Sequence, residues 1–183
     1  MAKPKRRYAI AIDQKRCINC KACVVACRAE NDVPVAYSRP WIDTHQRGHW
    51  PKVGIAFEPE QCHQCEHPAC TRVCPTGASY KRADGVVAIN QADCVGCRYC
   101  IIACPYEARF FREDKGVVEK CDFCSHRLDR GELPACVETC PTKVRIFGDL
   151  EDPRSILNEV LSKRQYRTKK PEAGTGPQLY YLL

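Results

Sequence analysis

The stretch Cys94-Val-Gly-Cys97-Arg-Tyr-Cys100-Ile-Ile-Ala-Cys104-Pro105 has the spacing that decides the fold. Its first three thiols are close enough in sequence to surround one metal-containing cofactor from a single loop, and the fourth follows one helical turn later. The chain of 183 residues contains sixteen cysteines, and all of them fall into four groups of this kind. In chain order, sequence groups one to four are Cys17, Cys20, Cys23 and Cys27; Cys62, Cys65, Cys70 and Cys74; Cys94, Cys97, Cys100 and Cys104; and Cys121, Cys124, Cys136 and Cys140.

Spacing separates the three uses that so many thiols can have, namely iron–sulfur clusters, zinc sites and disulfides. Groups one and three read C-x2-C-x2-C-x3-C, the spacing of bacterial ferredoxins, in which the fourth cysteine binds the other cluster of a pair. Zinc sites favour two pairs of ligands with a longer spacer. Disulfides accompany export, and we expect no signal peptide because the apolar stretch after the basic start is too short. All sixteen cysteines are therefore expected to be cluster ligands.

The charge of the chain agrees with this interpretation. The formal net charge is +7 when every thiol is counted as neutral. Sixteen thiolates and four oxidised cores of about +2 contribute about −8, so the loaded protein carries about −1. The basic excess thus offsets the cofactors and does not by itself indicate a nucleic-acid partner. No apolar run approaches the roughly 20 residues of a transmembrane helix, so none is expected.

Short strands are predicted around the cysteine groups. Turn residues between β-favouring segments predict hairpins over 78–89 and 108–118. Tyr8–Ile12 is expected to be an edge strand that leads into group one, and Arg145–Phe147 is expected to be its counterpart after group four. The expected fold class is α+β, with two ferredoxin-like halves of two clusters each, short hairpins, short helices and long loops.

Short helices are expected after the cysteine loops, over Val24–Asn31 and Ile101–Cys104, and a further helix over Pro153–Arg164 with Asp152 as its N-cap. Residues 28–61 show no strong periodicity and are expected to be an irregular surface insertion. The segment after the last cysteine serves no cluster and is expected to be a C-terminal docking tail. Spacing alone leaves the pairing of the groups open, because group one can pair with either group four or group two.

Several segments resemble the four-cluster iron–sulfur subunits of the DMSO-reductase family of molybdopterin oxidoreductases, with particular likeness to those of polysulfide, thiosulfate and tetrathionate reductases. The segments are Glu60-Gln-Cys-His-Gln-Cys65, Cys74-Pro-Thr-Gly-Ala-Ser-Tyr80, Lys120-Cys-Asp-Phe-Cys-Ser-His-Arg127, Pro134-Ala-Cys-Val-Glu-Thr-Cys-Pro141 and Phe147-Gly-Asp-Leu-Glu-Asp-Pro153. The resemblance covers nearly the whole chain. It implies an electron-transfer subunit with four [4Fe-4S] clusters and no catalytic site of its own.

The resemblance also implies that group one pairs with group four. One half then comprises residues 1–60 and 119–150, the other comprises residues 61–118, and residues 151–183 form the docking tail. The implied ligands are Cys17, Cys20, Cys23 and Cys140 for cluster 1; Cys27, Cys121, Cys124 and Cys136 for cluster 2; Cys62, Cys65, Cys70 and Cys104 for cluster 3; and Cys74, Cys94, Cys97 and Cys100 for cluster 4.

The implied partners are a molybdopterin catalytic subunit facing cluster 1 and a membrane-embedded quinol-reactive subunit facing cluster 4, in a complex of anaerobic respiration. The resemblance also implies export in the folded state with a catalytic partner that bears a twin-arginine signal, since Arg6-Arg7 of this chain lacks the apolar stretch of such a signal. The expected location is the outer face of the cytoplasmic membrane, with the cytoplasm as the alternative. The alternative functions are a freestanding polyferredoxin and a zinc-binding nucleic-acid or scaffold protein.

Cationic residues beside the ligands are the expected modulators of cluster potential, and the scattered histidines are expected at the surface or in hydrogen bonds near the ligands. The flanking cations are Lys15, Arg16, Lys21, Arg98 and Lys120.

Overall fold

A four-stranded sheet lies at the centre of the computed structural model, which describes residues 6–183. Its strands are ordered β8 (Arg145–Asp149), β1 (Tyr8–Ile12), β10 (Leu179–Leu182) and β9 (Tyr166–Arg167). The predicted pairing of β1 with β8 is confirmed and is antiparallel. The expectation that β1 is an edge strand is wrong, because β10 pairs with its other side in parallel.

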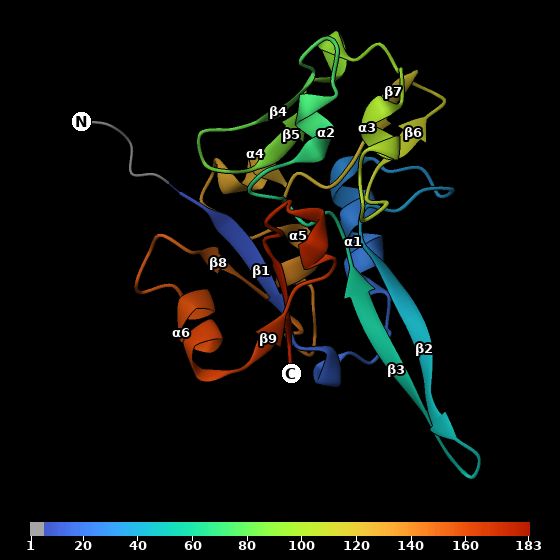
Figure 1. Cartoon of the computed structure of the whole chain (residues 1–183), viewed down its shortest axis with the longest axis vertical. Coiled ribbons are helices and arrows are strands. Elements are labelled where there is room, and N and C mark those ends of the chain that lie inside the picture. Colours follow the sequence, from blue (N-terminus) through green and yellow to red (C-terminus); the bar gives the residue numbers. More distant parts are fainter. Residues whose placement is uncertain (1–5) are drawn as a thin grey trace.

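The two faces of β1 serve different purposes because successive side chains of a strand point to opposite faces. Ala9 and Ala11 pack with the buried Leu157 of helix α6 (Ile156–Lys163). Ile10 and Ile12 belong instead to the core that surrounds the cysteine loops. The sheet therefore separates a small helical layer from the part of the molecule that holds the thiols (Figure 1).

The predicted hairpins are present on the far side of this core. They are β4 (Ser79–Lys81) with β5 (Val87–Ile89), and β6 (Phe110–Arg112) with β7 (Val117–Glu119). Short helices follow the cysteine loops, with bounds α1 (Ala22–Asn31), α2 (Ala69–Arg72), α3 (Tyr99–Ile102), α4 (Ser125–Leu128) and α5 (Ala135–Glu138). The remaining helical turns are η1 (Gln14–Arg16), η2 (Gln91–Asp93) and η3 (Pro171–Ala173). The molecule is thus α+β, as predicted.

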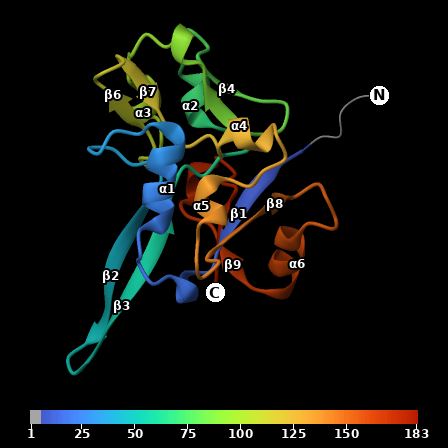
Figure 2. The ribbon, with the colours of Figure 1, turned by 180° about the vertical axis from the view of Figure 1, so that it is seen from behind.

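The expectation of an irregular insertion before Gln61 is wrong for its second part. Strands β2 (Trp41–His49) and β3 (Lys52–Glu60) pair along their whole length and project from the body as one hairpin (Figures 1 and 2). Both faces of the hairpin are exposed toward its tip, where Trp50 is 89% exposed. Because an exposed ribbon has no buried face, β2 carries no alternation of apolar and polar residues, although β3 has Val53, Ile55 and Phe57 at alternate positions.

The C-terminal segment is part of the fold, which differs from the docking tail expected over 151–183. Leu179, Tyr181 and Leu182 are almost fully buried in the sheet. Further upstream, the carbonyl oxygens of Gly176 and Thr175 accept hydrogen bonds from the backbone of residues 66–67, at 2.7 and 2.8 Å. The segment therefore contacts both the central sheet, through its apolar strand β10, and the backbone of residues 66–67, through its polar turn residues.

Helix α6 begins later than expected. Its N-cap is Ser155, and Asp152 instead accepts a hydrogen bond from the backbone of Arg154 at 3.0 Å, in the preceding turn. Within residues 6–183, the structure contains no helix with the length and apolar character needed to cross a lipid bilayer.

Candidate cofactor-binding site

All sixteen thiols are free, and the fold gathers most of them around three cavities. Each cavity encloses about 320–340 Å³ of space not filled by protein, part of it open to solvent. We define thiol set one as Cys17, Cys20, Cys23 and Cys140; set three as Cys62, Cys65, Cys70 and Cys104; and set four as Cys74, Cys94, Cys97 and Cys100.

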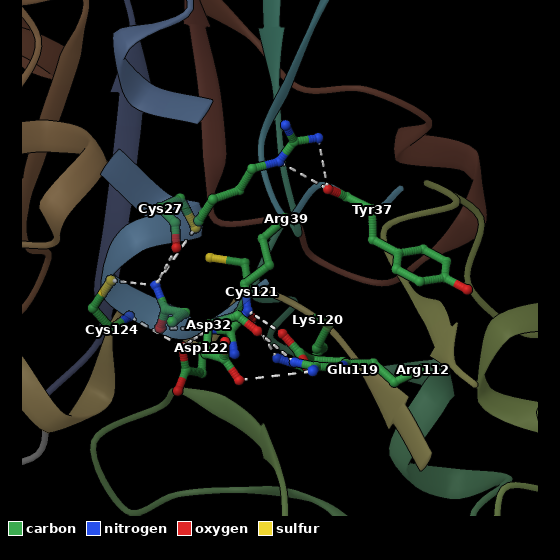
Figure 3. Close-up of polar contacts among 12 residues, drawn as sticks. Cys27, Asp32, Tyr37, Arg39, Arg112, Glu119, Lys120, Cys121, Asp122 and Cys124 are labelled. Atoms are coloured by element: carbon green, nitrogen blue, oxygen red, sulfur yellow. Dashed lines mark hydrogen bonds and ion pairs between the residues drawn. The ribbon is translucent and has the colours of Figure 1, made fainter. Parts of the chain in front are cut away.

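The remaining four thiols are buried together between α1 and α5, and we call Cys27, Cys121, Cys124 and Cys136 thiol set two. In Figure 3 the sulfur atoms of Cys27, Cys121 and Cys124 turn toward one another. The amide nitrogen of Asn31 lies 3.6 Å from both Cys27 Sγ and Cys124 Sγ. Burial and then the nearby Cys136 raise the pKa of Cys27 to about 12. Four such thiols stay together as thiolates only if a metal cofactor compensates their charge.

The strand pairing explains why set one combines the two ends of the chain. Ile12, the last residue of β1, is paired with Arg145, the first residue of β8. Asp13 continues the ladder by donating from its backbone N–H to the carbonyl of Val144 at 2.9 Å. Cys17 follows this junction by a few residues and Cys140 precedes it by a few, so their thiols meet on one side of the sheet.

Backbone N–H groups point at several of the thiols. Val144 N lies 3.3 Å from Cys140 Sγ, and Ser79 N lies 3.4 Å from Cys74 Sγ. Although burial acts in the opposite direction, these N–H groups lower the pKa of both cysteines below its ordinary value. Such donors stabilise negatively charged sulfur, as iron–sulfur ligation requires.

A buried ion network connects set two with the β6–β7 hairpin (Figure 3). Arg39 donates to Glu119, Asp122 and the side-chain oxygen of Asn31, each at 2.8 Å. Arg112 pairs with the same Glu119 at 3.2 Å. Because the oxygen of Asn31 is held by Arg39, its amide NH₂ group faces the two sulfur atoms. The network thus fixes both the hairpin and a polar group beside set two.

Two of the flanking cations expected to modulate the clusters contact other groups. Lys120 is buried and donates to the carbonyl oxygens of Cys121, at 2.7 Å, and Val87. The guanidinium of Arg98 lies 3.9 Å from the ring centroid of Phe111. Arg98 has a positive φ of 65°, which turns the cysteine loop at that point. These two residues therefore shape the loops.

Two buried arginines near the thiols, Arg109 and Arg145, are not among the residues expected from the sequence. Each follows a ligand cysteine by five residues in a Cys-Pro-x-x-x-Arg segment, and this recurrence is the signal that identifies them. Among the histidines, His63 is buried and its ring stacks on Tyr106 with 3.7 Å between the centroids, beside set three.

The donor chemistry fits iron–sulfur clusters. Each set offers four thiols around one cavity or one buried space, with N–H groups or a guanidinium directed at sulfur. Within residues 6–183, no three His, Cys, Asp or Glu side chains are arranged to hold a single metal ion, as a zinc site would require.

Comparison with known proteins gives the same result. A model of a 4Fe-4S dicluster domain matches residues 53–150, more than half of the chain, and a second model with the same description matches residues 16–79. The B subunit of the tetrathionate reductase of Salmonella typhimurium is 43% identical over an alignment 183 residues long, which covers 98% of this chain and 73% of that protein. The corresponding component of the polysulfide reductase of Wolinella succinogenes is 42% identical over 180 residues, covering 97% and 94%. Protein NrfC of Escherichia coli K12 is 45% identical over 177 residues, covering 95% and 79%.

The chain belongs to the family of 4Fe-4S dicluster iron–sulfur subunits that includes these relatives. As a family member with two 4Fe-4S dicluster domains, it carries four [4Fe-4S] clusters and transfers electrons. Its sixteen cysteines equal the number of ligands that four such clusters need.

The four sets follow one another through the molecule. Electrostatic interactions between thiols connect neighbouring sets through Cys23 with Cys136, Cys121 with Cys62, and Cys100 with Cys70. Among the sixteen cysteines, only Cys20 and Cys97 are exposed. These two cysteines belong to sets one and four, whereas all four thiols of set two are buried and those of set three are buried or half-buried.

Proposed function

We propose that the thiol sets are the ligand sets of the four clusters. Set one then binds cluster 1, set two cluster 2, set three cluster 3 and set four cluster 4, as the resemblance implied. Residues 1–60 and 119–150 supply the first pair of clusters, and residues 61–118 supply the second pair. The proximity of the four thiols within each set supports this assignment.

The protein is proposed to conduct single electrons between a molybdopterin-containing catalytic subunit at set one and a quinol-reactive membrane subunit at set four. When bound, the clusters supply reversible one-electron transfer without the making or breaking of bonds. The observation that carries this proposal is the exposure of Cys20 in set one and Cys97 in set four, whereas the other fourteen cysteines are buried or half-buried. The names of the relatives, components of tetrathionate and polysulfide reductases, support a complex of the same type.

Both ends carry exposed apolar side chains suited to a partner. Ile18 lines the cavity of set one, Val95 lines that of set four, and both are exposed. The exposed Val25 lies on α1, which carries Cys23, and the exposed Tyr99 and Ile102 lie on α3, which carries Cys100. Exposed apolar residues that cluster around a cofactor are typical of an interaction surface. Through such partners the protein is proposed to be held at the outer face of the cytoplasmic membrane.

Iron analysis tests the ligand assignment. Protein prepared without oxygen is expected to contain about sixteen iron atoms per chain and to show a broad absorption band near about 400 nm, because four cubane clusters are bound. A colourless protein with stoichiometric zinc would contradict the assignment.

Pull-down of the native complex tests the two docking ends. Ile18→Glu is expected to release the catalytic subunit, and Ile102→Glu the membrane subunit, because a charge at the centre of an apolar contact is left without a partner. Val35→Glu is the matched control, because Val35 is as exposed as Ile102 (84% and 83%), but no cysteine lies near it in the sequence, whereas Ile102 lies between Cys100 and Cys104. Retention of both partners in both end variants would contradict the proposed ends, and a wild-type protein without stable partners would favour a freestanding polyferredoxin.

A further inference from the structure

Two arginines occupy equivalent places in the internal repeat. Arg109 lies five residues after Cys104, and Arg145 lies five residues after Cys140, each with proline directly following the cysteine. Both side chains are deeply buried, since the residues are only 5% and 3% exposed. At the third Cys-Pro segment the corresponding residue is Ser79, whose hydroxyl accepts a hydrogen bond from Arg109 Nη2 at 2.9 Å.

Arg109 lies between sets three and four. It lines the cavity of set three, and its Nη2 atom lies 2.7 Å from Cys70 Sγ. Its positive charge also interacts with Cys100 of set four. One guanidinium therefore contacts a thiol of set three and interacts electrostatically with a thiol of set four.

Arg145 has the same relation to sets one and two. It lines the cavity of set one, and its positive charge interacts with Cys23 of that set. Its charge also interacts with Cys136 of set two. A further nitrogen of the guanidinium donates to the side-chain oxygen of Gln61, which keeps the group in place.

Neither arginine has the usual partner of a buried cation. Within residues 6–183, no ion pair joins Arg109 or Arg145 to a carboxylate, whereas the buried Arg112 pairs with Asp114 and Glu119. Moreover, Arg109 Nη1 and Arg145 Nη2 are buried without any hydrogen-bond acceptor. A buried guanidinium is costly unless negative charge compensates it. The thiols with which these arginines interact become negatively charged on ligation, so each arginine is placed for the charge of the loaded sites.

We propose that Arg109 and Arg145 each act on two clusters at once and raise the reduction potentials of both clusters in their half. Reduction adds a negative charge to a cluster, and a fixed positive charge with hydrogen bonds to its ligand sulfur stabilises the reduced form. In each Cys-Pro-x-x-x-Arg segment, the cysteine is thus a ligand of one cluster and the arginine raises the reduction potentials of two. This inference rests on the ligand sets proposed above.

EPR-monitored redox titration of the full, iron-loaded chain tests the proposal. In Arg109→Gln, the ratio of reduced to oxidised cluster at a fixed potential is expected to fall at least tenfold for clusters 3 and 4, a downward shift of about 59 mV for a one-electron couple. Clusters 1 and 2 should be unchanged. Arg145→Gln should give the reverse pattern. Arg82→Gln is the matched control, because it removes a half-buried arginine beside the β4–β5 hairpin whose ion-pair partners, Asp84 and Asp129, are carboxylates.

The lysine variants separate charge from structure. Arg109→Lys and Arg145→Lys keep the positive charge and are expected to retain most of the wild-type potentials, even where the glutamine variants bind less iron. The proposal is overturned if a lysine variant with full iron content shows the same tenfold fall, if all four clusters shift together, or if a fully loaded glutamine variant leaves its own pair unchanged. An error in the proposed ligand sets would be distinguishable from this, because Arg109→Gln would then lose iron from clusters 1 and 2, or Arg145→Gln from clusters 3 and 4.

Discussion

Removal of residues 177–183 is expected to abolish the folded, iron-loaded protein rather than to weaken docking alone. The deletion removes β10, whose Leu179, Tyr181 and Leu182 are almost completely buried. Burial of side chains of this size contributes about 1.5–3 kcal/mol each, and their sum is comparable with the entire net stability of about 5–15 kcal/mol of a typical domain. The deletion also leaves one side of β1 unpaired. Iron content and gel filtration after anaerobic expression measure the effect.

A pair of point variants provides the control for this deletion. Leu179→Ala is expected to lower the stability by about 2–5 kcal/mol, because it opens a cavity in the core. Leu183→Ala changes the same residue type at a position that is 52% exposed and should change the stability by less than about 0.5 kcal/mol. A truncated protein that kept its full iron content and native melting temperature would show that β10 is dispensable.

Cys140→Ser is expected to disrupt the cluster bound by Cys17, Cys20 and Cys23 while the other three remain. Cys140 lines the cavity of set one although it belongs to sequence group four. Its sulfur accepts the backbone N–H of Val144, so the substitution removes a positioned ligand and not merely a neighbouring thiol. EPR spectra of the reduced protein should lose one signal, and the iron content should fall by up to about four atoms.

Cys27→Ser is the reciprocal variant. Cys27 belongs to sequence group one but lies in set two, where Asn31 contacts it together with Cys124. Its replacement should disrupt the cluster of Cys121, Cys124 and Cys136. If each serine variant instead removed the cluster of its own sequence group, the cross-ligation proposed for the first half would be wrong.

The sequence identified the elements that depend on local signals. Turn residues between β-favouring segments correctly predicted the β4–β5 and β6–β7 hairpins, because a hairpin is specified by adjacent residues. The cysteine spacings likewise indicated the cofactor type that the family comparison supports. Both patterns lie within short windows of the chain.

Elements that depend on distant partners were not predictable in the same way. The sequence Leu179–Leu182 does not reveal that its partner is β1, at the opposite end of the chain. The strands β2 and β3 are stabilised by their hydrogen-bonded pairing with little burial toward the tip, and β2 lacks the apolar alternation that identifies a strand. In the sequence, Arg109 and Arg145 resemble ordinary cations at the start of a strand. Only the fold shows that Arg109 contacts Cys70 and that Arg145 lines the cavity of set one.

The antiparallel joining of β1 to β8 also constrains how the molecule is made. The thiols of Cys17, Cys20 and Cys23 emerge early in translation, yet the space they share with Cys140 exists only after β8 has been synthesised and has docked. Sets three and four, in contrast, draw all their thiols from residues 62–104. The thiols of sets three and four are therefore all present while the ribosome is still extending the chain. Those of sets one and two are complete only later, after Cys136 and Cys140 have been added.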